Sequence, residues 1–473
     1  MDTEHVVTAA PSAPPALSAP SAPSAPPSAL SAPSAPPSAL SAPSAPPSAL
    51  SAPSAPPSAL STSPAPSTTP APTGRPRLPE PLGAAFLARP EETLAEIRET
   101  CPVARIRTPA GRPAWLVTRA EDVRAGFLDS RLSLSGGHVP DPGVRRRALD
   151  VTLVNYDPPN HTRIRRLATP ALTPARMAAH RGRIERAAGD LLDAADAARG
   201  QGPLELMDAF ARPFAFRSLC EVFDVREEER AALYEPVALL ADKAGCSIRA
   251  VEESVARIDA FVRGEMTRRT ADPGDDVVSR VLAAWRHQGG ATEDEVASLL
   301  AMLLLAGFDS TVQAIGMSVV ALLGHRDVQD SLRDEPSRIP RAVDELLRWD
   351  TPGPFSTKRV ALEDVRFGNT VIPAGSGVLL SVAAANHDPR CHADPGTLDP
   401  DRDTAGRHLT FGLGPHYCPG SALARLELTV ALTVILGRWQ RLEPAVPLNE
   451  LAWGGGYLHR RLAALPVQPG SRA

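Results

Sequence analysis

The chain has almost no lysine. Lys243 and Lys358 are its two lysines, so arginine supplies nearly all of the positive charge, and the formal net charge at pH 7 is -4. Such a balance gives no strongly basic surface, which argues against a nucleic-acid-binding protein.

Cysteine is scarce as well. The five cysteines are scattered and none has CxxC spacing, which argues against a disulfide framework and fits a reducing cytoplasm. They are Cys101, Cys220, Cys246, Cys391 and Cys418.

We expect neither a signal peptide nor a membrane span. Met1–His5 has no basic region followed by an apolar core, which argues against a signal peptide. The longest apolar stretch, Val296–Leu323, is interrupted by the polar run Asp309–Thr311 and by Gln313. A charge in the middle of a membrane span is costly, so we expect a buried helix and no membrane partner.

Proline, alanine and serine dominate the beginning of the chain. Four identical copies of Ser-Ala-Pro-Ser-Ala-Pro-Pro-Ser-Ala-Leu run from Ser21 to Leu60. This composition offers little to bury, so residues 1–74 are predicted to be a disordered repeat tail rich in polyproline II conformation. A spacer or partner-docking arm is one interpretation. A repeat expansion without strong function, or a misassigned start codon, is favoured over it.

The pattern with the clearest chemistry is Phe411-Gly412-Leu413-Gly414-Pro415-His416-Tyr417-Cys418-Pro419-Gly420. Gly412 and Gly414 allow a tight turn through which backbone can approach a flat cofactor. The proline after Cys418 suits the first turn of a helix, expected over Pro419–Leu436. The N-terminus of that helix would favour a thiolate. The ordinary alternative is a buried free cysteine, which the flanking pattern makes improbable.

A second pattern, Ala306-Gly307-Phe308-Asp309-Ser310-Thr311, lies in the apolar stretch. Its two small residues open a groove for a diatomic ligand. A hydroxyl in mid-helix competes for the carbonyl four residues back, and a neighbouring acid can relay protons. Alone, this pattern is more often a solvated or helix-bending polar patch.

Helical patterns dominate the rest of the chain. Thr292 and Glu295 form a capping box that opens the long central helix. Arg105–Arg107 and Ala114–Thr118 read as paired strands, and Val360–Ala374 has strand-and-turn character. Helices are predicted over Glu91–Glu99, Arg119–Leu128, His161–Leu167, Pro174–Arg199, Leu204–Phe223, Arg226–Leu240, Val251–Ala271 and Ile339–Trp349.

The two patterns resemble the cytochrome P-450 superfamily, specifically its soluble bacterial heme-thiolate monooxygenases. The resemblance implies one catalytic domain over residues 75–473, mostly α with small β-sheets. Heme b (iron protoporphyrin IX) would lie between the central helix and the cysteine loop. Cys418 would be the axial ligand of the iron, with Phe411, Gly412 and Gly420 around it. A thiolate in that position favours O–O bond cleavage.

The resemblance also assigns the central helix. Asp309 would be the acid and Ser310 the alcohol of oxygen activation, with Thr311 as a further candidate. The family usually has threonine at the alcohol position. Ser310 keeps the hydroxyl but loses a methyl group, which would loosen control of water and increase uncoupling.

Four cationic positions match the family's donors to the heme propionates: His161, Arg165, Arg359 and His416. Arginine's fork suits a carboxylate. For any one of them the alternative is an ordinary surface cation, which the joint match makes improbable. His408 is a secondary candidate, and Arg163 and Arg166 are expected to meet solvent or an acidic redox partner.

The helix around Glu345 carries a structural prediction. Glu345 and Arg348 stand three residues apart on one helix face. The resemblance implies that they bind an arginine in a later loop, for which Arg402 is the best candidate, and that the three hold the heme loop in place.

The implied reaction inserts one atom of O2 into a hydrophobic small molecule by hydroxylation or epoxidation. Electrons would come from NAD(P)H through a separate ferredoxin reductase and ferredoxin, and the substrate would belong to polyketide, peptide or terpenoid metabolism. Substrate contacts are expected from Leu132–Val144, Leu239–Val251 and Gly353–Thr357, with apolar bulk from Phe308 and Phe355.

Two alternatives remain. One is a same-fold peroxygenase, dehydratase or oxidative-coupling enzyme, against which the acid–hydroxyl pair argues, although Ser310 weakens that argument. The other is a non-catalytic recruitment module, which could have lost Cys418 and Asp309 and has not.

Overall fold

The computed structural model describes residues 84–108, 111–136, 149, 153–200, 202–403, 407–456 and 459–472. The predicted tail over residues 1–74 lies outside these ranges. All described residues belong to one compact unit, 71–473.

The helices are α1 (Ala84–Ala88), α2 (Pro90–Thr100), α3 (Ala120–Leu128), α4 (Asn160–Ala168), α5 (Pro174–Ala179), α6 (Arg181–Arg199), α7 (Arg212–Phe223), α8 (Glu227–Ala241), α9 (Ile248–Ala271), α10 (Val277–Gln288), α11 (Glu293–Gly324), α12 (Arg326–Asp334), α13 (Ile339–Trp349), α14 (Val382–Asn386) and α15 (Ser421–Arg438).

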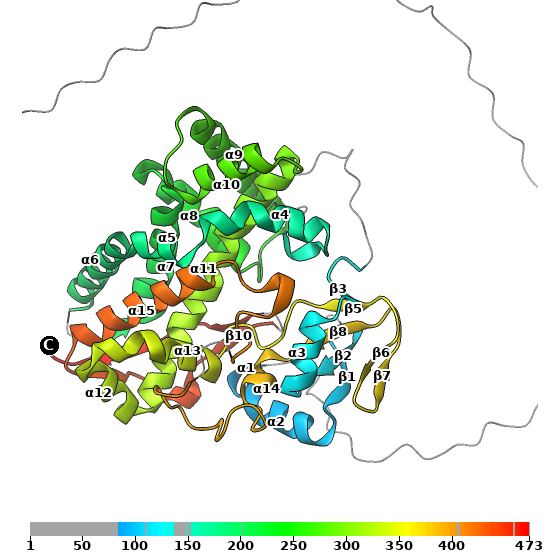
Figure 1. Cartoon of the computed structure of the whole chain (residues 1–473). Helices are drawn as coiled ribbons and strands as arrows, with labels where there is room; N and C mark the ends of the chain where they lie inside the picture. Colours follow the sequence, from blue (N-terminus) through cyan, green and yellow to red (C-terminus); the bar gives the residue numbers. More distant parts are fainter. Residues whose placement is uncertain are drawn as a thin grey trace, which may run out of the picture. The chain divides into compact units, whose positions relative to one another are not determined.

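Helix α11 forms the centre of the fold. The predicted capping box is confirmed: Glu295 N donates to Thr292 Oγ1 at 3.2 Å, and Thr292 N donates to Glu295 Oε2 at 2.9 Å. Helices α7, α8, α9 and α15 pack around α11 (Figure 1). Within the part of the chain that the structure describes, α11 is the one helix long and apolar enough to cross a membrane. Its burial by these neighbours identifies it as the core helix.

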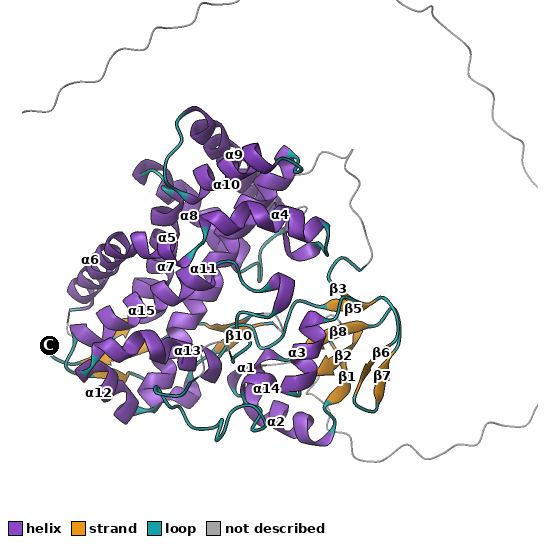
Figure 2. Cartoon of the chain, viewed as in Figure 1, coloured by secondary structure: helices purple, strands orange, loops and turns teal. Residues whose placement is uncertain are grey.

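The strands form one five-stranded sheet and three smaller sheets. The five-stranded sheet lies at one side of the fold, beside α3 (Figure 2). The main sheet has the order β1-β2-β8-β5-β3. The predicted pair is confirmed as the antiparallel β1 and β2, with Val103 opposite Val117. The strands are β1 (Val103–Arg107), β2 (Pro113–Val117), β3 (Leu132–Ser133), β4 (Leu204–Glu205), β5 (Arg359–Ala361), β6 (Val365–Phe367), β7 (Thr370–Ile372), β8 (Gly377–Leu380), β9 (Leu442–Pro444), β10 (Trp453–Gly455), β11 (Arg460–Leu462) and β12 (Pro466–Pro469).

Two predicted helices are divided in the structure. The helix predicted over Pro174–Arg199 breaks at His180, whose backbone N–H donates to Met177 O, three residues back. The helix predicted over Leu204–Phe223 begins instead as strand β4, paired with β12. A π-turn follows at Met207–Ala211, where Pro213 removes one backbone donor from the regular helical ladder.

Helix α15 begins two residues later than predicted. Cys418, Pro419 and Gly420 form a turn, in which Ser421 N donates to Cys418 O at 3.4 Å. The regular helical bonds start when Ala424 N donates to Gly420 O at 2.9 Å. From there α15 packs against α6, α11 and α13, so it runs from the cysteine loop into the main core.

Candidate heme site

The cysteine loop folds as its glycines predict. Gly412 and Gly414 both have positive φ, 72° and 73°. A Cβ on Gly414 would lie 2.9 Å from Leu128 Cδ2, too close for an ordinary contact. The backbone N–H of Cys418 donates to Phe411 O at 2.8 Å and closes the loop. The two glycines therefore let the loop lie against the end of α3.

The thiol of Cys418 lies in a largely apolar place. Burial raises its pKa above the ordinary value, while the Gly420 backbone N–H, Arg165 and Arg425 lower it without reversing the shift. The backbone at the start of the helix therefore acts in the predicted direction, because the Gly420 N–H lowers this pKa, but burial outweighs it. A cation bound at the sulfur would reverse the balance, because a coordinating thiol loses its proton.

Arg425 links the cysteine loop to α13. Its guanidinium lies 4.5 Å above the ring of Phe411, and its Nε donates to Asp344 Oδ1 at 2.8 Å. His408 Nε2 lies 3.0 Å from the same carboxylate oxygen. His408 is thus paired with Asp344, and its role as a secondary propionate donor stays a prediction.

The four predicted cationic donors are half-buried or buried, and His161, Arg359 and His416 form a cluster. The rings of His161 and His416 lie 3.9 Å apart between centroids. Arg359 is 5% exposed, and its Nη1 donates to Leu132 O at 3.1 Å. Arg165, one helical turn after His161, lines a cavity of about 680 Å³ together with Cys418.

This basic cluster has too little negative charge around it. Burial lowers the pKa of His161 to about 4, that of His416 to about 3 and that of Arg359 to about 10. Burial also lowers the pKa of Arg165. Both ring nitrogens of His161, and Nε of Arg359, have no hydrogen-bond partner among the described residues. Buried donors without acceptors are costly, so the cluster fits a dianionic group such as the two propionates of heme.

Helix α11 brings Asp309 to an ion pair that the sequence analysis did not foresee. Asp309 Oδ2 accepts from Arg461 Nε at 3.1 Å and from Arg461 Nη2 at 3.0 Å. Arg461 belongs to β11, and its Nη1 also lies 2.7 Å from Asp242 Oδ1, just after α8. The predicted acid is therefore tied to the C-terminal strands and to the end of α8.

The two hydroxyls beside Asp309 point to different partners. Ser310 Oγ donates to Ala306 O at 2.7 Å, the carbonyl four residues back that the sequence pattern indicated. Thr311 Oγ1 instead donates to Glu427 Oε2 of α15 at 3.1 Å, in the core. Thr311 therefore joins α11 to α15, and this geometry gives no support to its predicted catalytic contribution.

Glu427 is a buried carboxyl that the sequence analysis missed. It is 1% exposed, and burial raises its pKa to about 8, although hydrogen bonds from Ser218 and Thr311 lower it. Among the described residues neither Glu427 Oε1 nor Ser218 Oγ has a hydrogen-bond partner within bonding geometry, yet Ser218 lies close enough to act on this pKa. A pKa of about 8 favours the protonated, uncharged carboxyl at neutral pH.

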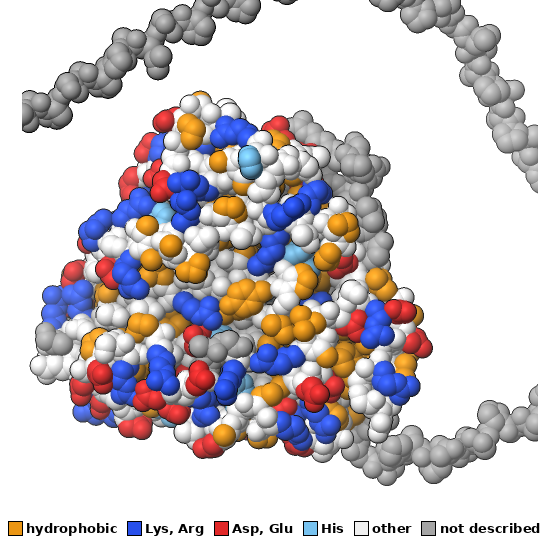
Figure 3. Space-filling model, viewed as in Figure 1, with side chains coloured by type: hydrophobic (Ala, Val, Ile, Leu, Met, Phe, Trp, Pro, Cys, Tyr) orange, Lys and Arg blue, Asp and Glu red, His pale blue; other side chains and the backbone are white. Residues whose placement is uncertain are grey.

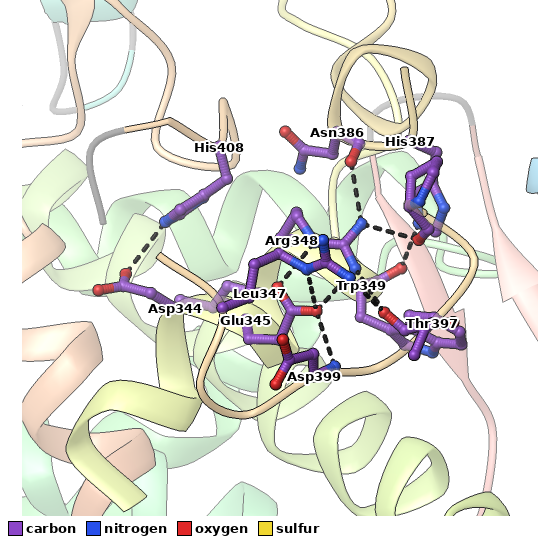
Figure 4. A network of polar contacts seen from close by, with 12 residues as sticks. Asp344, Glu345, Leu347, Arg348, Trp349, Asn386, His387, Thr397, Asp399 and His408 are labelled. Atoms are coloured by element: carbon purple, nitrogen blue, oxygen red, sulfur yellow. Dashed lines mark hydrogen bonds and ion pairs between the residues drawn. The ribbon is translucent and has the colours of Figure 1, made fainter. Parts of the chain in front are cut away.

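The structure brings Glu345, Arg348 and Arg402 together. Figure 4 shows the first two of these, with Asn386 and Thr397 beside Arg348. Arg348 makes two bonds of 2.8 Å to the carboxylate of Glu345 and reaches the carbonyl oxygens of Asn386 and Thr397 at 3.0 and 3.4 Å. Arg402 Nε donates to Glu345 Oε1 at 3.0 Å. Both Glu345 and Arg348 are fully buried, so their pair fixes α13 against the chain that leads to the cysteine loop.

Three further expectations concern Arg163, Phe308 and Phe355. Arg163 forms an ion pair within the protein, because its Nη2 lies 2.6 Å from Glu295 Oε1. Arg166 is exposed, as expected. Phe308 packs edge-on against Phe216 and Tyr234 of α7 and α8. Phe355 stacks on Phe86, with ring centroids 6.0 Å apart. Both rings therefore pack in the apolar core of the described structure, and their contribution to the substrate pocket stays a prediction.

A cysteine thiol close to a cluster of buried basic side chains with unsatisfied polar atoms fits a heme-thiolate protein. The family description "Cytochrome P450" matches residues 247–451. The chain is 36% identical to cytochrome P450 107B1 of Saccharopolyspora erythraea over 398 residues, which cover 82% of this chain and 96% of that protein. It is 37% identical to the mycinamicin IV hydroxylase/epoxidase of Micromonospora griseorubida, covering 79% of this chain and 94% of the relative.

Solved structures agree with the sequence relatives. The ligand-free P450 monooxygenase TamI superposes with a TM-score of 0.76 at 34% identity, covering 82% of this chain and 93% of TamI. The chain belongs to the cytochrome P450 family, and it is a heme-iron monooxygenase of bacterial specialised metabolism. The predicted mostly helical fold and reaction class are confirmed.

Proposed function

We propose that this monooxygenase holds heme b, with Cys418 as the axial ligand and with His161, Arg165, Arg359 and His416 as donors to the propionates. The observation that carries the proposal is the set of orphaned donor atoms in the basic cluster. Bound there, the heme iron supplies the activation of O2 with two external electrons. The residues of the chain hold the group and deliver protons.

Asp309 and Ser310 are proposed to supply those protons. Both contacts from Arg461 use Oδ2 of Asp309, so among the described residues Oδ1 keeps its lone pairs for a water or a proton. Ser310 Oγ donates its proton to Ala306 O and can accept one through its oxygen lone pairs. We propose that a proton taken up by Asp309 passes on to Ser310; while the carboxyl holds that proton, its contact with Arg461 is a hydrogen bond to a neutral acid, and the ion pair returns when the proton leaves.

A ferredoxin reduced by an NAD(P)H-dependent reductase is the proposed electron donor. The cavity beside Cys418 is lined by Arg165, Arg181 and Arg425 together with the half-exposed Tyr417. In Figure 3 basic side chains lie across the middle of the visible face, while acidic side chains gather toward its edges. An acidic partner that docks over this cavity would bring its electrons close to the cysteine loop, and charge complementarity would speed the encounter.

The proposed substrate is a hydrophobic polyketide, peptide or terpenoid, hydroxylated or epoxidised in the cytoplasm. The relative from Micromonospora griseorubida, named as a hydroxylase/epoxidase of mycinamicin IV, supports this class. Of the two small residues before Asp309 on α11, Ala306 is exposed, whereas the space beside Gly307 is filled by Leu219, 2.8 Å from where a Cβ would lie. We propose that oxygen and substrate approach the helix on the side of Ala306. The relevant pocket should be mainly apolar with few polar anchors.

Two measurements test the proposal. The reduced, CO-bound protein should show the thiolate-type Soret shift, and an ordinary imidazole-type spectrum would contradict heme-thiolate ligation by Cys418. With ferredoxin, reductase and NADPH, Asp309→Asn should slow product formation by about 100-fold, as for loss of a proton donor, with heme content unchanged. The matched control is Asp242→Asn, which removes the other carboxylate of Arg461 and should keep near-normal turnover.

The same assay separates the oxidative alternatives. Product formed with peroxide alone, and none with the reconstituted electron chain, would favour a peroxygenase. Unchanged turnover in Asp309→Asn would contradict the proton-delivery role.

A further inference from the structure

Asp157 is a carboxylate that the heme site does not use directly, yet it receives four hydrogen bonds. Oδ2 accepts from the hydroxyls of Ser133 at 2.5 Å and Ser135 at 2.7 Å, and from Ser135 N at 3.2 Å. Oδ1 accepts from Leu134 N at 3.0 Å. Burial alone would raise the pKa of Asp157, but these bonds outweigh it and hold the pKa below its ordinary value. The group is therefore an anion that fixes residues 133–135.

Those bonds reach two members of the basic cluster, Arg359 and His161. Leu132 directly precedes the bound segment, pairs with Ala361 in the main sheet, and offers its carbonyl to Arg359 Nη1. On the other side, the backbone carbonyl of Asp157 accepts from His161 N at 2.9 Å, which sets the first turn of α4. One residue thus links the strand that holds Arg359 to the helix that carries His161.

We propose that Asp157 is a positioning residue for the cofactor: it sets the spacing between Arg359 and His161 so that both can bind the same anionic group. This role rests on the proposed heme site, and it gives Asp157 no contact with heme. The fixed spacing matters because each donor is buried and has little freedom to adjust once the group is bound.

Charge and position predict opposite effects, which makes the role testable. The charge of Asp157 raises the pKa values of His161, Arg359 and His416, so it partly neutralises the cluster and opposes a second anion there. If charge alone mattered, removing the carboxylate would tighten the hold on an anionic heme. If position matters, removal weakens the hold, because three donors on Oδ2 lose their shared acceptor.

The experiment measures the rate of heme transfer from the holoenzyme to excess apomyoglobin, with thermal unfolding recorded for every variant. Asp157→Asn should release heme about tenfold faster, equivalent to about 1.4 kcal/mol. The double variant Ser133→Ala, Ser135→Ala keeps the charge and should shift the rate in the same direction by less. If Asp157→Asn fails to fold, the heme-release rate of this double variant tests the positioning role instead.

Asp388→Asn is the matched control for general damage. Like the half-buried Asp157, the buried Asp388 accepts backbone N–H bonds, from Ala120 and Arg390, at 2.9 and 3.0 Å. Its variant should unfold at lower temperature without faster heme release. A heme-release rate in Asp157→Asn equal to or below that of the wild type would overturn the positioning role. Failure of the wild type itself to hold heme would instead overturn the proposed function.

Discussion

Glu427 should make the stability of this protein depend on pH between about pH 4.5 and 8. The unfolded chain releases this proton near the ordinary value of 4.5, whereas burial in the folded protein raises the pKa to about 8. Between these values the folded state binds the extra proton, so the free energy of unfolding falls as pH rises. Below pH 4.5 the proton is bound in both states, and above pH 8 the loss is complete.

The size follows from the shift. Each unit of pKa is worth about 1.4 kcal/mol, so a difference of roughly 3.5 units corresponds to about 5 kcal/mol across the window. Glu427→Gln keeps the shape and an amide donor for Ser218 but cannot titrate. The difference in free energy of unfolding, variant minus wild type, should therefore increase by about 1.4 kcal/mol for each pH unit within the window.

The assay is thermal unfolding of the holoenzyme at several values from pH 5 to 9. For a domain this large, 1 kcal/mol moves the midpoint by about 2 °C, so the gap between variant and wild type should widen by several degrees. Glu335→Gln, which replaces an exposed carboxyl, is the control. Its unfolding midpoint should differ from that of the wild type by the same amount at every pH. Parallel curves for Glu427→Gln and wild type would refute the assignment of a neutral buried carboxyl.

Three further changes test other contacts. Glu345→Gln leaves the buried guanidinium of Arg348 without its anion and should cost about 3–5 kcal/mol of stability in denaturant unfolding, together with a lower heme content. A double-mutant cycle of Asp309→Asn with Arg461→Gln should give a coupling of about 0.5–3 kcal/mol, and strict additivity would contradict the ion pair. Ser310→Thr should raise the fraction of consumed NADPH that appears as product; an unchanged fraction would show that the missing methyl does not cause uncoupling.

Features with a local cause could be predicted from the sequence. The turn at Gly412 and Gly414 depends on backbone freedom that is visible in the residue type, and both glycines do adopt positive φ. The capping box of α11 joins residues three apart, and Ser310 bonds to a carbonyl four residues back. In each case the interacting groups lie within one turn, so chain geometry almost determines the contact.

Contacts between distant segments could not be predicted in the same way. Asp309 and Arg461 are 152 residues apart, and Thr311 and Glu427 are 116 apart. Nothing local distinguishes Arg461 from the many arginines on the surface, because only packing of β11 on α11 brings it to Asp309. The Glu345, Arg348 and Arg402 group was reachable because a family pattern supplied the long-range link that residue types alone do not.

The anchoring of α11 by β11 has a consequence for how the protein is made. Asp309 binds Arg461, and Gln313, one turn further along, accepts from Leu462 N at 2.8 Å. During synthesis α11 emerges well before β11, and the two polar groups on its surface lack these partners throughout that interval. A nascent chain arrested before Arg460 should therefore expose them to protease and solvent, and the oxygen-side wall of the site would be completed only when the last strands are delivered.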